Sequence, residues 1–354
     1  MSALATPGPL VKAPPAKRRL IWLQRTVLGV LAMLVALAGF GATYQAVATE
    51  LDERAYPAPG QLIDVGGYKL HIHCMGQGSP TIILDHVGAG NSAQWGVVQP
   101  EIAKRTRVCA YDRAGFGWSE AGPAPRDAQH NARELHALLS NAQIPGPYVL
   151  VGHSFGANVA RLYLAAHPDK VVGMVLIDPG HLFDTPGVPT DVNARWQAED
   201  QFIMRAGPWL SRLGLMRLAA ALGGVPDHGD LPVRQGAAFD ALNLTTKFWD
   251  TLAAQNAAMP ATSAQVLHAP HDYGALPLVV LSATEPDDKS RRVWSKVNAE
   301  VATFSSNSSY RVVVGATHMG LAYAREQAQP AIAAISQVVE AARTQRPLRP
   351  QGNR

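Results

Sequence analysis

A serine that stands between two glycines at the end of an apolar run is the first candidate for chemistry in this sequence. Residues 148–153 (YVLVGH) lead directly into Ser154, with Gly152 before it and Gly156 after it, and residues 155–166 then follow a helical pattern. At a tight strand-to-helix turn, such glycines let the strand and the helix approach closely, and the hydroxyl stands clear of the sheet. The pattern therefore predicts that Ser154 is a nucleophile.

A serine hydroxyl is a weak nucleophile and needs an adjacent base that a third group orients. His318 directly follows the last predicted strand, in the stretch VVVGATHMGL, and we predict that it is the base. For the acid we favour Asp287, because Pro286 should turn the chain after the preceding strand and present the next side chain inward. Three alternatives stay open: Glu285, Asp288, and Asp178 at the end of the strand before.

This chemistry requires no cofactor and no metal. His71 and His73 alternate along a predicted strand, but no cysteine or acidic residue stands beside them at the spacing of a metal site. The Gly-x-Gly-x-x-Gly spacing of a dinucleotide site is not met either.

The elements around Ser154 predict an α/β fold. A Gly-Gly turn at 66–67 separates two strands that read as a hairpin, and further strands then alternate with helices, which is the pattern of a sheet covered on both faces. In residues 126–144, apolar side chains recur on one helical face. The predicted strands are 61–67, 68–76, 81–87, 106–115, 148–154, 171–180, 276–284 and 310–318, and the last helix is 327–342.

The sheet pattern stops between about 180 and 275, where residues 207–224 and 239–259 read as helices. An insertion of this kind would cover the pocket as a cap and set the substrate range. One apolar group in it we interpret as packing residues rather than as a face that dips into a membrane: Trp209, Leu210, Leu213, Leu215 and Met216.

Charge is concentrated at the two ends of the chain. The formal net charge is +4, but the first 49 residues hold five Lys and Arg without an acid and residues 343–354 hold four Arg, so residues 50–342 carry −5. The body therefore offers no basic groove, and we expect no nucleic-acid partner. Residues 1–25 form a basic N-terminus, of which residues 1–19 are expected to be disordered, and residues 343–354 are expected to form a basic, disordered tail.

Residues 26–49 contain no charged side chain and are long enough to cross a bilayer. The basic residues before them and the acids Glu50, Asp52 and Glu53 after them orient the segment with its N-terminus in the cytoplasm. We predict a transmembrane helix at 26–48, a tether at 49–60, and a catalytic domain at 61–342 outside the cytoplasm, on the periplasmic side in a bacterium. A cleaved signal peptide, with 46–48 (AVA) as its cleavage signal, and a buried core helix are the alternatives.

From about 60 to 342 the chain resembles the α/β-hydrolases, and in particular bacterial membrane-anchored hydrolases. The stretches that carry the resemblance are VGGYKLHIHCMGQGSPTIILD, RVCAYDRAGFGWS, PGPYVLVGHSFGANVARLYLAAHPDKVVGMVLIDPGH and WSKVNAEVATFSSNSSYRVVVGATH. The resemblance implies an eight-stranded, mostly parallel sheet with helices on both faces and a helical cap. It also implies Ser154 as nucleophile, His318 as base and a carboxylate after the seventh strand, with Asp112 and Arg113 in a structural loop near the oxyanion side.

One departure from the family concerns the oxyanion hole. Many relatives have His-Gly after the third strand, whereas this chain has Val87 where glycine is frequent. We expect the N–H groups of Phe155 and of Gly88, or of Val87 in its place, to form the hole. The resemblance then predicts hydrolysis of an ester or similar acyl compound with an apolar part, and serine at position 154 argues against dehalogenases and epoxide hydrolases. A non-enzymatic ligand sensor on the same fold is the alternative.

The only two cysteines are Cys74 and Cys109. The strand order 1-2-4-3 of this fold would place their strands side by side, so that a disulfide closing a loop of about 35 residues is conceivable outside the cytoplasm. Because free cysteines are among the most buried residues and cross-strand bridges are geometrically demanding, we favour two buried thiols.

Overall fold

The computed structural model describes residues 16–180, 182, 185, 188–224, 228–284 and 289–348. Eight strands form one sheet in the order β1-β2-β4-β3-β5-β6-β7-β8. β2 runs antiparallel to β1 and β4, and the remaining pairs are parallel. The predicted α/β-hydrolase sheet is therefore confirmed. Its strands are Gln61–Asp64 (β1), Lys69–Met75 (β2), Thr81–Asp85 (β3), Val108–Tyr111 (β4), Tyr148–His153 (β5), Val171–Ile177 (β6), Leu278–Ala283 (β7) and Ser308–Val313 (β8).

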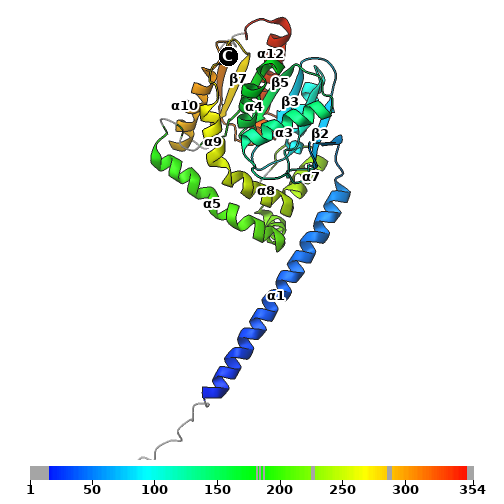
Figure 1. The fold of residues 1–354 in the computed structure, drawn as a ribbon, viewed down its shortest axis with the longest axis vertical. Coiled ribbons are helices and arrows are strands. Elements are labelled where there is room, and N and C mark those ends of the chain that lie inside the picture. The colour runs from blue at the N-terminus through cyan, green and yellow to red at the C-terminus, as the bar shows by residue number, and fades with distance from the viewer. Residues whose placement is uncertain are drawn as a thin grey trace, which may run out of the picture.

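Helices cover both faces of the sheet (Figure 1). The central strands are buried on both sides, so successive residues serve opposite layers: Ile83 and Leu150 pack in the layer of α3 and α4, whereas Ile82 and Val151 pack in the layer of α12. This burial explains why the central strands read as continuous apolar runs rather than as alternating ones. The helices outside the cap are Val98–Ala103 (α2), Ala128–Asn141 (α3), Phe155–Ala166 (α4), Lys289–Ala302 (α10), Gly320–Tyr323 (α11) and Gln329–Thr344 (α12), with short 3₁₀ turns at Ser92–Gly96 (η1) and Pro168–Lys170 (η2).

The β1–β2 hairpin forms as predicted. Gly66 and Gly67 both have positive φ, and their N–H groups donate to Asp64 Oδ1 over 2.9 and 3.2 Å. Further along β2, Cys74 is the register partner of Cys109 on β4, and the two form a disulfide. The expectation of two free thiols was wrong, because the antiparallel register sets these two residues directly opposite each other.

The cap consists of helices that lie over the C-terminal ends of the strands (Figure 1). Two predicted helices are each interrupted: the first breaks at Gly214, which has a φ of 70°, and the second breaks at Thr245, whose side chain caps the helix that follows. Thr262 Oγ1 ties the last cap helix to α3 by accepting the Ala128 N–H. The cap helices are Thr190–Arg212 (α5), Leu215–Ala219 (α6), Val233–Asn243 (α7), Thr246–Ala257 (α8) and Met259–His268 (α9), with a π-helical turn at Ala220–Gly224 (η3).

Helix α1 runs without a break from Ala16 to Ala55 and projects from the body as a single rod (Figure 1). By length and composition, Arg19–Ala55 could cross a membrane. The segment expected to be a tether, 49–60, is helical as far as Ala55. It packs on the cap, where Asp52 pairs with Arg217 over 2.6 Å. Earlier in the same helix, Gln45 donates to the Leu244 carbonyl of the cap over 2.9 Å. After the helix, Trp118 Nε1 donates to the Tyr56 carbonyl.

The start of the C-terminal tail is also held by the domain. Arg343, in the last turn of α12, donates to the Ser79 carbonyl. After the helix, the Leu348 N–H donates to Asn307 Oδ1. The rest of the expected disordered tail, 349–354, and the first 15 residues lie outside the described residues.

Candidate active site

Ser154 stands at the junction between β5 and α4, at φ 54° and ψ −116°, a conformation that a non-glycine residue rarely adopts. The flanking glycines are required by close approach. A Cβ on Gly152 would lie 2.4 Å from the Gly156 carbonyl oxygen, and a Cβ on Gly156 would lie 2.8 Å from the carbonyl oxygen of Asp85 on β3. Strand, turn and helix therefore interlock as the sequence predicts, and the strained backbone projects the serine side chain from the sheet edge.

The Phe155 N–H opens α4, and N–H groups in a first helical turn have no intrahelical acceptor. Gly88 lies beside it, since a Cβ built there would be 3.4 Å from Phe155 Cβ. The N–H of Val87, the alternative donor, already has an acceptor, because it donates to Gln94 Oε1 over 3.1 Å. Between the two residues that the sequence left open, Gly88 is therefore the better placed second donor.

Arg113 holds the backbone of this loop. It is fully buried, forms an ion pair with Asp85, and donates to the carbonyls of His86 and Val87 over 2.8 Å each. Its guanidinium also lies 5.1 Å from the centre of the Phe155 ring. These contacts give Arg113 a structural role, because they hold residues 85–87 in place next to Phe155.

The carboxylate that contacts His318 is Asp178, with Oδ2 2.6 Å from His318 Nδ1. Asp178 is buried at the C-terminal end of β6, has a φ of 40°, and accepts the Ala283 N–H over 3.3 Å. The sequence favoured Asp287, after the seventh strand, and left Asp178 open as an alternative; among the described residues, Asp178 is the carboxylate that contacts His318. Asp287 itself, with Glu285 and Asp288, lies outside the described residues.

Asp178 is suited to this position because β6 is the direct neighbour of β5 in the sheet. The end of β6 therefore comes beside the nucleophile turn, and the Ser154 N–H donates to the carbonyl of Ile177, the residue before Asp178. In the sequence, Asp178-Pro179-Gly180 resembles an ordinary turn after a strand. The sequence therefore offered Asp178 only as an alternative, although an acidic residue ends the strand that follows the Ser154 turn.

Three hydrogen bonds in series connect Val87, in the loop after β3, with His318, in the loop after β8. The Val87 N–H donates to Gln94 Oε1, Gln94 Nε2 donates to His153 Nδ1 over 3.2 Å, and His153 Nε2 donates to the His318 carbonyl over 2.9 Å. Burial lowers the pKa of His153 to about 3, so its ring stays neutral, with one donor and one acceptor as the chain requires. The rings of His153 and His318 lie 4.8 Å apart. Sequence reasoning placed His153 in the turn but missed Gln94, whose loop position carries no recognisable motif.

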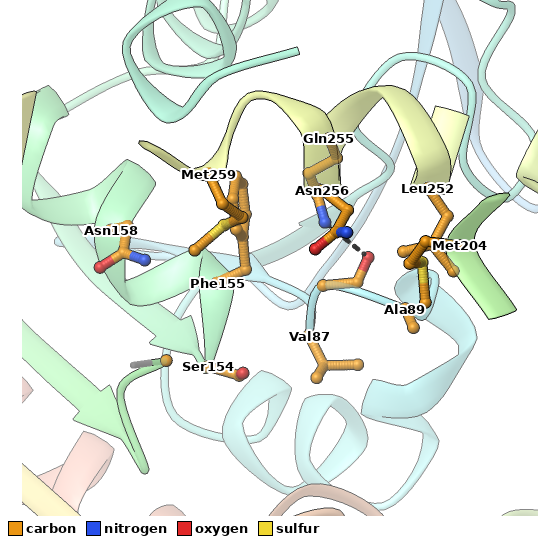
Figure 2. Close-up of a pocket in the computed structure, with 12 residues that line it drawn as sticks. Val87, Ala89, Ser154, Phe155, Asn158, Met204, Leu252, Gln255, Asn256 and Met259 are labelled. Atoms are coloured by element: carbon orange, nitrogen blue, oxygen red, sulfur yellow. Dashed lines mark hydrogen bonds between the residues drawn. The ribbon is translucent and has the colours of Figure 1, made fainter. Parts of the chain in front are cut away.

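A pocket of about 220 Å³ opens at Ser154 beneath α8 and the start of α9, and Figure 2 shows the serine side chain directed into it. Its wall is mainly apolar, with Met204 from α5, Leu252 from α8 and Met259 from α9. Two buried amides also line it. Among the described residues, Asn158 Nδ2 and Gln255 Oε1 have no hydrogen-bond partner. The pocket can therefore enclose a small apolar group and still offer a donor and an acceptor to a polar one.

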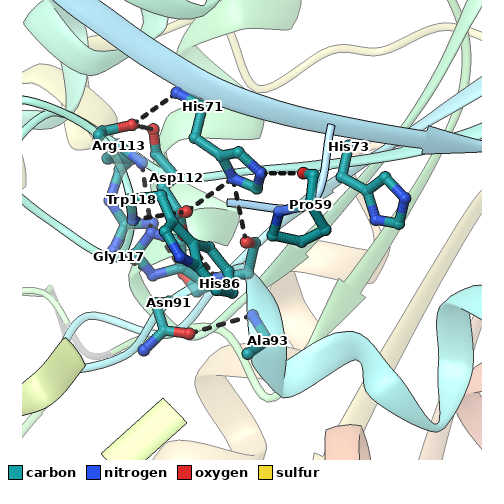
Figure 3. Close-up of polar contacts among 12 residues, drawn as sticks. Pro59, His71, His73, His86, Asn91, Ala93, Asp112, Arg113, Gly117 and Trp118 are labelled. Carbon is teal, nitrogen blue, oxygen red and sulfur yellow. Dashed lines mark hydrogen bonds and ion pairs between the residues drawn. The ribbon is translucent and has the colours of Figure 1, made fainter. Parts of the chain in front are cut away.

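His71 belongs to a second buried polar cluster, which includes Asp112 and Pro59 (Figure 3). Its Nδ1 donates to Asp112 Oδ2 over 2.8 Å and its Nε2 to the Pro59 carbonyl, so both ring nitrogens face acceptors. Burial alone would lower the pKa of His71, but the hydrogen bond and charge of Asp112 outweigh burial and raise it. His73 points away from this cluster (Figure 3). The contacts make His71 a buried cation that fastens residue 59 to the sheet, which is a structural role.

Comparisons with known proteins agree with the α/β fold of the body. Residues 80–212 match the family described as alpha/beta hydrolase fold. The chain is 38% identical over 136 residues to lipase LipV of Mycobacterium tuberculosis, covering 37% of this chain and 49% of that one. It is 37% identical over 127 residues to 2-hydroxymuconate semialdehyde hydrolase of Pseudomonas sp., covering 34% and 44%. Both alignments span less than half of the relative's length.

Among solved structures, the epoxide hydrolase CorEH superposes with a TM-score of 0.61 at 20% identity, covering 80% of this chain and 98% of that chain. At this identity the likeness shows the fold alone. The comparisons thus bear on the body of the chain, whereas the chemistry has to be argued from Ser154 and its surroundings.

Proposed function

We propose that this chain, which belongs to the α/β-hydrolase superfamily, is a serine hydrolase that cleaves ester or similar acyl bonds. The observation that carries the proposal is the strained Ser154 turn at a pocket, together with His318, whose carbonyl contacts His153 of the same turn and whose Nδ1 is held 2.6 Å from the buried Asp178 carboxylate. The relatives named as lipase and hydrolase support hydrolytic chemistry. The assignment of Ser154, His318 and Asp178 as the triad is the proposed part.

In the proposed mechanism, Ser154 Oγ attacks the substrate carbonyl while His318 Nε2 takes its proton. Asp178 accepts the Nδ1 proton of His318, keeping the imidazole in the tautomer whose Nε2 is free and stabilising the cation that forms. The N–H groups of Phe155 and Gly88 stabilise the oxyanion. His318 then gives its proton to the leaving group, and water releases the acyl group by the same route.

The pocket supports a substrate with an apolar acyl or alcohol part of modest size. Met204, Leu252 and Met259 supply flexible and apolar contact surface, and thioether side chains adapt readily to different shapes. Asn158 Nδ2 and Gln255 Oε1, which have no hydrogen-bond partner among the described residues, favour a substrate that also carries a hydrogen-bonding group near the scissile bond.

We further propose that α1 anchors the enzyme in the cell membrane with the catalytic domain outside the cytoplasm. The uncharged segment of α1 at 26–49, the basic residues before this segment and the acids after it support this orientation. The Cys74–Cys109 disulfide also fits an oxidising compartment. Protease added to spheroplasts should digest the body and leave the N-terminus protected, and a protected body would reverse the orientation.

The hydrolase proposal is tested with p-nitrophenyl esters of increasing acyl length, using the full chain solubilised in detergent and its Ser154→Ala variant. We expect turnover of at least some of the esters and a loss in kcat of at least ~10³-fold in the variant, since only binding and the oxyanion donors would remain. Near wild-type turnover by Ser154→Ala would remove the nucleophile assignment. Absence of turnover across the panel, with specific binding retained, would favour the ligand sensor instead.

A further inference from the structure

A large apolar patch lies exposed on one corner of the cap. It consists of Trp209, Leu213, Leu215, Leu218 and Leu222, and we call it the cap corner; Trp209 is 71% and Leu222 80% exposed. From the sequence, the first three of these are expected to be packing residues, and this expectation is wrong because all three are exposed. Contiguous apolar patches are uncommon on monomeric soluble proteins and mark interaction sites.

The outward side of the cap corner is depleted of charge. Residues 215–224 contain a single charged side chain, Arg217, and it is turned inward, where it pairs with Asp52 and donates to Gln45 Oε1 and Thr49 Oγ1 of α1. At the edge of the corner, Arg212 pairs with Asp250 over 2.7 Å. The Arg217 charge therefore does not lie on the leucine-rich outer surface, and such a surface is suited to contact with an apolar medium.

The cap corner is joined to α1 within the apolar part of that helix. A Cβ on Gly41 would lie 2.3 Å from the Leu213 carbonyl oxygen, and one on Gly214 would lie 3.0 Å from the Tyr44 ring. Ala38, Gly41 and Gln45 are less exposed than the neighbouring residues of α1, so a stripe with helical spacing faces the cap. Figure 1 shows the end of α5 beside this part of α1.

The position of this contact along α1 sets its depth in a bilayer. Trp22 and Tyr44, aromatic residues of the kind found at membrane interfaces, are separated by about 33 Å along a helix, close to the roughly 30 Å of hydrocarbon. Gly41 lies on the apolar side of Tyr44, about 14 Å along the helix from Glu50. A bilayer that covers the uncharged segment of α1 therefore reaches the level of Leu213 and Gly214.

We propose that the cap corner inserts into the outer leaflet of the same bilayer that α1 crosses, and that the enzyme draws its substrate from that leaflet. The proposal rests on the proposed membrane anchor. α5 carries both Trp209 on the corner and Met204 in the wall of the Ser154 pocket, so one helix connects the lipid-facing surface with the site. The substrate class becomes an amphiphilic ester that resides in the membrane.

The insertion is tested with the full chain in phosphatidylcholine vesicles, using single introduced cysteines labelled with an environment-sensitive fluorophore. The native cysteines are paired in the disulfide and do not react under non-reducing conditions. Leu222→Cys reports the cap corner and Val35→Cys the middle of α1. Ser140→Cys is the matched control, because it is exposed at the end of α3, before the N-terminal edge of β5 and away from the cap. Lipids that carry a spin-label quencher either near the headgroup or deep in the acyl chain measure depth.

We expect the deep quencher to act best on the label at position 35 and the shallow quencher on the label at 222, with position 140 unaffected. Quenching at 35 with position 222 behaving like position 140 would overturn the proposal while leaving the anchor intact. No quenching at 35 would overturn the anchor and the insertion together. Self-quenching at 222 without lipid quenching would show that a second copy covers the corner, which also contradicts the proposal.

Measurements of enzyme activity provide a second, independent test of the proposed insertion. Leu218→Ser with Leu222→Ser should lower turnover of a long-chain ester dissolved in vesicles by at least ~5-fold, because the apolar area that enters the leaflet is reduced. Turnover of a short soluble ester should stay unchanged, since neither residue lines the pocket. Equal losses on both substrates, or no loss on either, would contradict delivery from the membrane.

Discussion

Replacing Asp178 by asparagine changes one atom in the contact on which the proposed base depends. The native Oδ2 accepts the proton of His318 Nδ1 over 2.6 Å, a short charge-assisted hydrogen bond. An asparagine amide nitrogen in that place would donate, so His318 would hold its proton on Nε2, the nitrogen that must take the proton of Ser154. The comparable substitution in serine proteases lowers kcat about 10⁴-fold, which corresponds to about 5 kcal/mol in the activation barrier.

We therefore expect Asp178→Asn to lower kcat for a soluble p-nitrophenyl ester by about 10⁴-fold, with KM changed by less than about 3-fold. The Asp178 N–H bond to the Leu281 carbonyl does not involve the side chain, so the variant should fold, and its thermal midpoint serves as the check. Asp287→Asn, at the carboxylate that the sequence favoured, is the matched control and should retain nearly full activity. If Asp287→Asn were the inactive variant and Asp178→Asn active, the assignment of the acid would be refuted.

Three further predictions concern the disulfide, the buried His71 and the hydrogen-bonding side chain of Gln94. Replacing Cys74 and Cys109 by alanine should lower the free energy of unfolding by about 3 to 4 kcal/mol, because the bridge closes a loop of 35 residues, and a calorimetric midpoint equal to that of the native protein would contradict the bridge. His71→Gln should destabilise the protein more at pH 6 than at pH 9. The folded-state pKa of His71 lies above its usual 6.5, so its stabilising contribution is complete below about pH 6.5 and is lost as the pH rises through the raised pKa. A difference in melting temperature between variant and native protein that does not depend on pH would argue against the buried cation. Gln94→Leu removes both bonds of this side chain and should lower kcat by up to ~10²-fold at a similar KM, whereas unchanged kcat would show that the hydrogen-bond chain does not position the two loops.

The fold and the tight turn at Ser154 could be predicted from sequence because their signals are local. Residues 148–166 combine a buried strand, two close-approach glycines and a helix, and every strand expected in the body is present in the structure. Position 318 was predictable for the same reason, since a histidine directly after the last strand stands at the edge where the sites of this fold lie.

The acid, the disulfide and the cap corner could not be predicted in this way, because each depends on which segments meet in space. Asp178 looks like a turn residue until β6 is placed beside β5, and the two cysteines become partners only through the antiparallel register of β2 and β4. Leu213 has the composition of a packing residue, yet it is exposed because the contact with α1 is made by its backbone. Apolar character identifies a residue that avoids water and leaves open whether protein or lipid covers it.

The central claim is that Ser154 carries the acyl group during turnover, and covalent labelling tests it most directly. The full chain in detergent is treated with a fluorophosphonate, which reacts with activated serines, and is then examined by intact mass and peptide mapping. We predict one adduct per chain, on Ser154, with ester turnover lost in proportion to labelling and no adduct in Ser154→Ala. Full turnover by a chain labelled at Ser154, or an adduct on another residue that accounts for the loss of activity, would contradict the claim.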